Sequence, residues 1–164
     1  MQGKNDFIRI AEDNNFVIDI NIIQMFAKIQ RIHSFREEWG GIIIGYYDCL
    51  CKGLRISDIT YPQKNDVCGS YSFKRKSCGH QEIMDELWEK SNHKKSYLGE
   101  WHTHNQYKPI PSWVDIRNWK KISKRGHNFD ELLFAIVGKE YIGFWSVNLN
   151  SINEIGFINR EVIK

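Results

Sequence analysis

The chain has 164 residues, a length typical of one domain and sufficient to bury one hydrophobic core. Its 23 lysines and arginines face 20 aspartates and glutamates, and this near balance argues against a nucleic-acid-binding surface. No stretch approaches the ~20 apolar residues that span a bilayer, and residues 1–6 contain no apolar run of a secretory signal. We therefore expect one cytoplasmic domain over residues 1–164, with neither nucleic acid nor membrane as a partner.

Helical and extended patterns alternate along the chain. In chain order they predict strands at residues 7–11 and 16–18, a helix over 22–31, strands over 41–46, 54–61 and 67–73, a helix over 81–90, a strand over 96–104, a helix over 112–124, and strands over 132–137 and 142–147. The run over 41–46 has no polar face, which is typical of a strand covered on both sides. The alternation indicates an α/β fold in which helices sandwich a sheet.

Two groups of side chains have open interpretations. The four cysteines, Cys49, Cys51, Cys68 and Cys78, would stay reduced in the cytoplasm. Their spacings contain no C-x-x-C pair, so a structural zinc site on them is the less favoured alternative. The basic run 74–76 is interpreted as a solvated loop, the alternative being a contact with an acidic partner.

One group of residues in the second half of the chain has the spacing of metal ligands. His102 and His104 are two apart on an expected strand, so both imidazoles project to one face and can reach one ion. Pro111 leads into Ser112, a suitable N-cap, which puts Asp115 in the first turn of the next helix. A carboxylate there can turn back toward the two histidines. The pattern therefore predicts a zinc site with these two histidines and this aspartate as ligands.

The predicted ligand set indicates a class of reaction. Three protein ligands leave a fourth position for water, which is typical of catalytic zinc, whereas structural zinc usually has four protein ligands. The alternative is that the histidines are ordinary polar residues and S-x-x-D is only a capping box. Two other zinc hydrolases are disfavoured, because the sequence lacks both HExxH and the P-C-x-x-C segment of nucleobase deaminases. The joint pattern favours a hydrolase.

The pattern resembles the motif of the JAMM (JAB/MPN) metalloproteases, in which H-x-H, seven residues and S-x-x-D follow an upstream glutamate. In that family the glutamate precedes a Gly-Gly strand, as Glu38 precedes Gly40 and Gly41 here. The resemblance therefore selects Glu38, although chemistry alone does not exclude its neighbour Glu37.

This resemblance, which extends from about residue 38 to residue 147, implies both a fold and a set of roles. The fold is the MPN (JAB) fold, a mixed sheet between helices in a three-layer arrangement like that of cytidine deaminases. Zinc would be held by His102, His104 and Asp115, and Glu38 would be the base that takes a proton from the attacking water. The Ser112 hydroxyl would stabilise the oxyanion.

The segment 99–104, Gly-Glu-Trp-His-Thr-His, is most similar to bacterial JAB proteins encoded beside ubiquitin-like conjugation enzymes, including the Cap3-type isopeptidases of CBASS anti-phage systems. That subgroup implies a protein substrate with an extended C-terminal tail, a CD-NTase conjugate, and E1/E2-like enzymes encoded nearby. One alternative is a Bil-type enzyme that processes a ubiquitin-like protein, and another is a non-catalytic MPN scaffold. Asn105 departs from the family, where many relatives have proline.

Three residues around the motif have structural and functional interpretations. Thr103 lies between the histidines and should point to the opposite face as a packing residue. Trp101 and Trp113 are more typical of a core, and the alternative is that they border a groove for the substrate tail.

Overall fold

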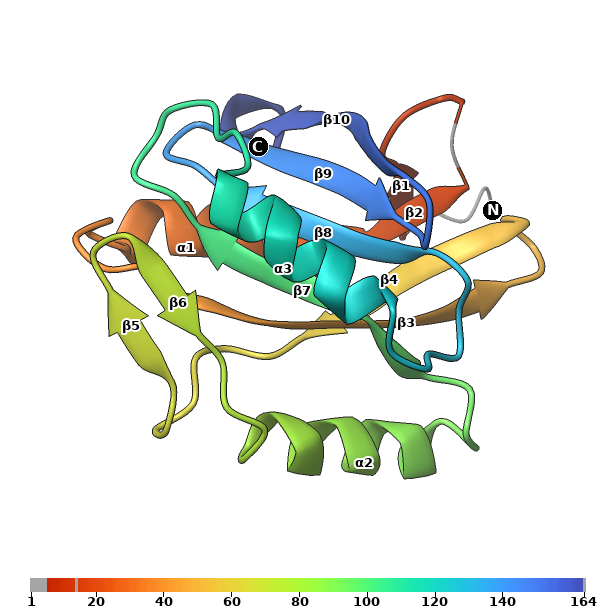
Figure 1. Cartoon of the computed structure of the whole chain (residues 1–164). Helices are drawn as coiled ribbons and strands as arrows, with labels where there is room; N and C mark the ends of the chain where they lie inside the picture. Colours follow the sequence, from red (N-terminus) through yellow and green to blue (C-terminus); the bar gives the residue numbers. More distant parts are fainter. Residues whose placement is uncertain (1–5, 14, 164) are drawn as a thin grey trace.

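A computed structural model describes residues 6–13 and 15–163 (Figure 1). Residues 1–5, on which part of the argument against a secretory signal rests, lie outside the described residues. The strands are β1 (Phe7–Arg9), β2 (Phe16–Asp19), β3 (Gly40–Asp48), β4 (Gly53–Ile59), β5 (Val67–Gly69), β6 (Ser72–Lys74), β7 (Ser96–Thr103), β8 (Leu132–Val137), β9 (Tyr141–Val147) and β10 (Ile152–Asn159). The helices are α1 (Ile20–Ile32), α2 (His80–Lys90) and α3 (Trp113–Ser123), with a short 3-10 helix at Arg160–Ile163.

The main sheet is mixed, as expected. Its strand order is β1-β2-β4-β3-β7-β8-β9-β10. β2 pairs with β4 and β7 pairs with β8 in parallel, while the remaining neighbours are antiparallel. The central strand β3 therefore lies beside β7, and the glycines at the start of β3 face the histidine segment at the end of β7.

The helices cover both faces of the sheet, which confirms the predicted sandwich (Figure 1). Alternation along β3 sends Ile43 into the core beneath α1, whereas Ile42 and Ile44 contact Met84 of α2 on the other face. Trp119 of α3 packs on Phe134 of β8 on that same face, with ring centroids 4.9 Å apart. The resulting layers are α1, the sheet, and α2 with α3.

Two elements differ from the sequence prediction. Residues 67–73 form a hairpin, β5 and β6, that pairs only with itself, because the chain reverses at Ser70 and Tyr71. The edge strand β10 was not predicted, since it is only partly buried and lacks a clean alternation of apolar residues. A register shift between Glu154 and Gly156 further disturbs its pattern.

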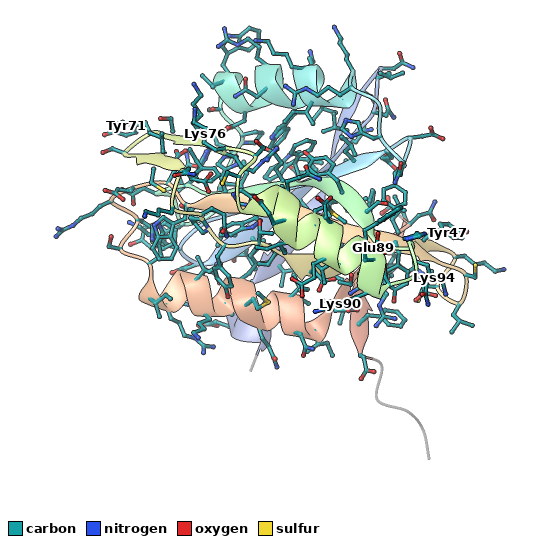
Figure 2. The ribbon with its side chains drawn as sticks, turned by 90° about the horizontal axis from the view of Figure 1, so that it is seen from below. Tyr47, Tyr71, Lys76, Glu89, Lys90 and Lys94 are labelled. Carbon is teal, nitrogen blue, oxygen red and sulfur yellow. The ribbon has the colours of Figure 1, made fainter. Side chains whose placement is uncertain are left out.

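The four cysteines are free, and the alternative of a shared structural zinc is wrong for them. Cys49 and Cys51 follow the end of β3, whereas Cys68 lies in β5, whose neighbour Gly69 bonds Glu38 just before β3 begins. A nine-residue strand is about 30 Å long, so these thiols cannot share an ion. Figure 2 shows the same separation. Tyr47, near the end of β3, and Tyr71, in the turn between β5 and β6, lie on opposite sides of the molecule. Among the described residues, no helix is both long enough and apolar enough to cross a bilayer.

Candidate metal centre and active site

A bulge in β7 orients the residues that precede the site. The register with β3 shifts between Ile43 and Ile44, so Leu98 is an extra residue opposite that step. Gly99 has φ 157°, and a Cβ there would lie 1.7 Å from the carbonyl oxygen of Leu133. Only glycine fits this close approach. After the bulge, Glu100 and His102 turn to the face that carries α2 and α3.

The sequence-predicted ligands converge in the structure. His102 Nε2 and His104 Nε2 are 3.0 Å apart. Asp115 Oδ1 lies 3.2 Å from His102 Nε2, and Asp115 Oδ2 lies 3.3 Å from His104 Nε2. These three side chains therefore meet at one point, between the end of β7 and the start of α3.

The start of α3 fixes Asp115 as the sequence predicts. Ser112 is the N-cap, and its hydroxyl accepts a hydrogen bond from the Asp115 N–H. The Asp115 carboxylate accepts one in return from the Ser112 N–H. This capping box holds the carboxylate facing the histidines.

Glu38, in the connection between α1 and β3, also joins the cluster. Its Oε1 lies 3.8 Å from His104 Nε2. The side chain of Glu37 is exposed, and its carbonyl oxygen accepts a hydrogen bond from His33 Nε2. Glu38 and the two histidines form a group with ligand atoms within 4.8 Å of one another, so proximity alone would also allow Glu38 as a ligand. The shorter distances of Asp115 to both imidazoles favour Asp115 as the third ligand.

Sequence analysis missed Gln106, which orients one of the histidines. His104 Nδ1 lies 3.3 Å from Gln106 Oε1, an atom that also accepts a hydrogen bond from the Ile110 N–H. Because an amide oxygen only accepts, Nδ1 carries a proton. In the neutral imidazole the Nε2 atom beside Asp115 therefore has its lone pair available to a metal, whereas in the protonated ring it donates to Asp115. A glutamine two residues after a histidine has no distinctive pattern that would reveal this role.

The cluster shifts the pKa values of its members. Burial raises the pKa of Asp115, but hydrogen bonds from His102 and His104 outweigh it and hold that pKa far below its usual range. Burial lowers the pKa of His104, and the hydrogen bond and charge of Asp115 reverse this, so the net pKa is raised. Burial raises the pKa of Glu38 despite the opposing charges of the histidines. A half-buried carboxyl of this kind is suited to exchanging protons.

The donor set fits zinc. Two ligands at about 2.0–2.1 Å from one tetrahedral ion lie roughly 3.3 Å from each other. The three pairs among His102, His104 and Asp115 are 3.0, 3.2 and 3.3 Å apart. Two imidazole nitrogens with one carboxylate are also a ligand combination that zinc prefers.

The cluster lines a groove of about 670 Å³. In Figure 1 the β5–β6 hairpin and the start of α3 flank the end of β7, and both elements contribute walls. The residues that line the groove outside the cluster include Ser70, Tyr71, Ser72, Phe73, Lys74, Glu100, Asn105, Val114 and Asn118. Such a groove can accept an extended chain.

This geometry tests three interpretations of the sequence. The Trp101 side chain is in the core, 1% exposed, with its ring against Phe26, so its core interpretation is confirmed. Trp113 is 76% exposed and does not line the groove, so both interpretations of Trp113 are wrong. Arg75 is not a solvated charge, because its guanidinium donates to Glu100 Oε1 at 2.8 and 3.0 Å.

Thr103 points away from the groove, as predicted. It is 1% exposed, and its hydroxyl contacts His33 on the α1 side of the sheet.

Comparison with known proteins gives consistent matches over this region. A family model described as prokaryotic homologs of the JAB domain matches residues 23–148. The chain is 35% identical over 116 residues to a CD-NTase/cGAS isopeptidase of Escherichia coli, covering 70% of this chain and 73% of that protein. It is 31% identical over 130 residues to a protein of the same name from Vibrio cholerae, covering 79% and 78%.

Solved structures show a similar fold. A Desulfitobacterium hafniense protein matches with a TM-score of 0.55 at 17% identity, covering 82% of this chain and 85% of that one. A Salinibacter ruber protein matches with a TM-score of 0.51 at 11% identity, covering 87% and 90%. At these identities the likeness concerns the fold alone.

Proposed function

The chain belongs to the prokaryotic JAB family, and from this premise we propose that it is a zinc-dependent isopeptidase. It would release a protein from a conjugate by cleaving the bond after that protein's C-terminal residue. We also propose that residues 1–164 act as one JAB domain in the cytoplasm. The family match supports an isopeptidase; zinc, the residue roles and the substrate are parts of the proposal.

The observation that carries the proposal is the convergence of four side chains in one groove. His102, His104 and Asp115 approach one another within 3.3 Å, and Glu38 lies 3.8 Å from His104. Zinc held by the first three would act as a Lewis acid on the scissile carbonyl and lower the pKa of a bound water to about 7.

Glu38 would move the proton during hydrolysis. Water adds across the C–N bond, with its hydroxyl going to the carbonyl carbon and its proton to the leaving amine. The raised pKa of Glu38, caused by burial, lets this carboxylate take the proton first and release it to the amine afterwards. The Ser112 hydroxyl accepts the Asp115 N–H, so its own proton remains available to stabilise the oxyanion.

The substrate would be a CD-NTase joined through its C-terminal carboxyl to an amine of a second protein. This class comes from the names of relatives that are 31–35% identical to this chain. The groove supports it in shape, since about 670 Å³ between the hairpin and α3 suits a slim tail better than a folded surface. E1- and E2-like enzymes encoded nearby would make such conjugates.

The test is cleavage of a CD-NTase fused through its C-terminus to a reporter protein. With zinc, we expect two products, and mass spectrometry should place the cut after the last CD-NTase residue. Addition of a chelator should stop the reaction, and zinc should restore it. An intact fusion in the presence of zinc would contradict the proposal.

Two alternatives predict different outcomes in the same assay. A Bil-type enzyme would cleave a fusion to a ubiquitin-like protein in preference to the CD-NTase fusion. A scaffold would cleave neither fusion. A scaffold would not need metal ligands, whereas this chain retains His102, His104 and Asp115.

A further inference from the structure

The connection between α1 and β3 holds Glu38 although it has no regular secondary structure. The Glu38 N–H donates a hydrogen bond to the Gly69 carbonyl oxygen at 2.7 Å. The next residue, Trp39, exchanges two hydrogen bonds with Thr103. Its N–H donates to Thr103 Oγ1 at 2.9 Å, and its carbonyl oxygen accepts from the Thr103 N–H at 2.8 Å. Thr103 is the residue between the two histidines, so these hydrogen bonds fix the backbone next to Glu38 relative to the backbone next to His102.

His33 adds two contacts to these backbone hydrogen bonds. Its Nε2 lies 2.7 Å from the Glu37 carbonyl oxygen and 3.2 Å from Thr103 Oγ1. A carbonyl oxygen can only accept, so His33 Nε2 carries a proton and donates it there. One imidazole therefore contacts the residue before Glu38 and the residue that bonds Trp39.

The His33 ring is held in place by packing. It is 7% exposed, and its centroid lies 4.3 Å from that of Trp39 and 4.8 Å from that of Phe35. Phe35 has φ 58°, a left-handed conformation that is rare for a bulky residue. Such a conformation persists where surrounding contacts require it. Burial lowers the pKa of His33, which keeps the ring neutral with a single N–H donor.

We propose that His33 is a positioning residue for Glu38, through its Nε2–H bond to the Glu37 carbonyl oxygen and its contact with Thr103 Oγ1. The inference rests on the function proposed above and extends it. Nothing in the reaction touches His33 directly. Its loss would let the backbone of Glu38 move relative to the histidines, and displacements of about 1 Å at a reacting group cost up to about 100-fold in rate.

Two variants separate the hydrogen bond from ring packing. His33→Phe keeps an aromatic ring against Trp39 and Phe35 but has no donor. His33→Gln has a donor that can reach the Glu37 carbonyl oxygen but no ring. We expect His33→Phe to lower kcat on the CD-NTase fusion about 10- to 100-fold with KM and bound zinc unchanged, and His33→Gln to keep most of kcat. A kcat in His33→Phe equal to wild type, or an equal loss in both variants, overturns the inference.

His127 provides a matched control elsewhere in the chain. Its Nε2 donates to the Ile122 carbonyl oxygen at 2.7 Å, and its ring stacks on Tyr97 at 5.4 Å. His127→Phe should therefore leave kcat unchanged.

A second measurement separates the inference from the proposed function. Amide hydrogen exchange of Glu38 and Trp39 does not depend on turnover, and we expect it to be at least about tenfold faster in His33→Phe than in wild type. If wild type fails to cleave the fusion with zinc, the proposed function fails while this exchange still decides the role of His33. Unchanged exchange at both amides overturns the positioning role.

Discussion

The Asp115 carboxylate accepts a hydrogen bond from the Ser112 N–H over 2.6 Å, and the Ser112 hydroxyl accepts one from the Asp115 N–H over 3.2 Å. This reciprocal pair begins α3 and at the same time aims the carboxylate at His102 and His104. Helix capping and ligand orientation are therefore performed by one structural unit, and a substitution there affects both stability and activity.

Ser112 variants can separate these two effects. Ser112→Ala removes the cap and should lower the free energy of unfolding by about 1 kcal/mol, whereas Ser112→Gly should cost only a few tenths, about 0.3 kcal/mol. Both lack the hydroxyl, so we expect both to lose about 100-fold in kcat on the CD-NTase fusion. Urea unfolding and initial rates measure the two quantities. An activity loss that followed stability, large in Ala and small in Gly, would limit Ser112 to capping.

Glu38→Gln should abolish most turnover while keeping the metal. The amide fills the same space but cannot take a proton, so we expect a loss of about 10²–10⁴-fold in kcat. Bound zinc, measured by elemental analysis, should remain at the wild-type level because the ligands are the two histidines and Asp115.

The matched control is Glu37→Gln, one residue away with an exposed side chain. Its kcat should equal that of wild type. Full activity in Glu38→Gln together with a loss in Glu37→Gln would reverse the assignment of the base.

Zinc affinity should increase with pH through the histidine range. Burial lowers the pKa of His104, but Asp115 and Glu38 outweigh it, so the net pKa lies above the ordinary value of 6.5. Because the pKa is raised, a proton competes with zinc for His104 below pH 6.5 and somewhat above it. In that range, zinc affinity falls about tenfold for each unit by which the pH is lowered, for every proton that zinc must displace. Titration with a competing chelator between pH 5.5 and 8.5 measures this. A constant affinity over that range would exclude His104 from the ligand set.

In the metal-free protein, these pKa shifts make the free energy of unfolding depend on pH. The contribution of His104 to stability is present below pH 6.5 and is lost as the pH rises through its raised pKa. The contribution of Asp115, whose pKa is lowered, is present above the ordinary value of 3.8 and is lost as the pH falls. Metal-free protein should therefore be most stabilised by this pair between about pH 4 and 6.5. Asp115→Asn should remove that maximum from a series of urea unfolding curves.

The sequence was sufficient to predict much of the fold and the set of residues that meet at the site. Period-two spacing placed His102 and His104 on one face, and the S-x-x-D pattern placed Asp115 in the first helical turn. Both are local rules, in which a few neighbouring residues determine the geometry. The apolar run of β3 is equally local, since its burial on both faces is evident from composition.

Other features depend on contacts between distant segments and were not predictable. The bond from Glu38 to Gly69 joins residues 31 positions apart, and the contact of Thr103 with His33 joins residues 70 apart. The groove walls likewise come from the hairpin and α3, which are adjacent only after folding. Leu98 joins the same core as Trp101 although the two are three residues apart, because the bulge before Gly99 changes the alternation that the sequence alone suggests.

The hairpin is anchored at its base by one buried contact between a carboxylate and an imidazole. Asp66 Oδ2 lies 2.8 Å from His80 Nε2, and both side chains are almost fully buried, at 0% and 1% exposure. His80 Nδ1 contacts Thr60 Oγ1 at 2.6 Å, which connects the pair to β3 through the Ile42 N–H. Asp66 Oδ1 also accepts the Lys76 N–H at 2.8 Å, so one carboxylate joins the two ends of the hairpin.

Removing this carboxylate should loosen the groove wall. Asp66→Ala leaves His80 and two backbone N–H groups without their acceptor, and leaving buried donors unpaired in this way costs about 1–3 kcal/mol in the free energy of unfolding. Urea unfolding should report that loss, and amide exchange should become faster across β5 and β6. Asp85→Ala is the matched control, because Asp85 is exposed on α2 and accepts a hydrogen bond from the exposed side chain of Gln81, and it should change stability by less than about 0.5 kcal/mol. Equal stability losses in the two variants would mean that the hairpin is held by its other contacts and not by Asp66.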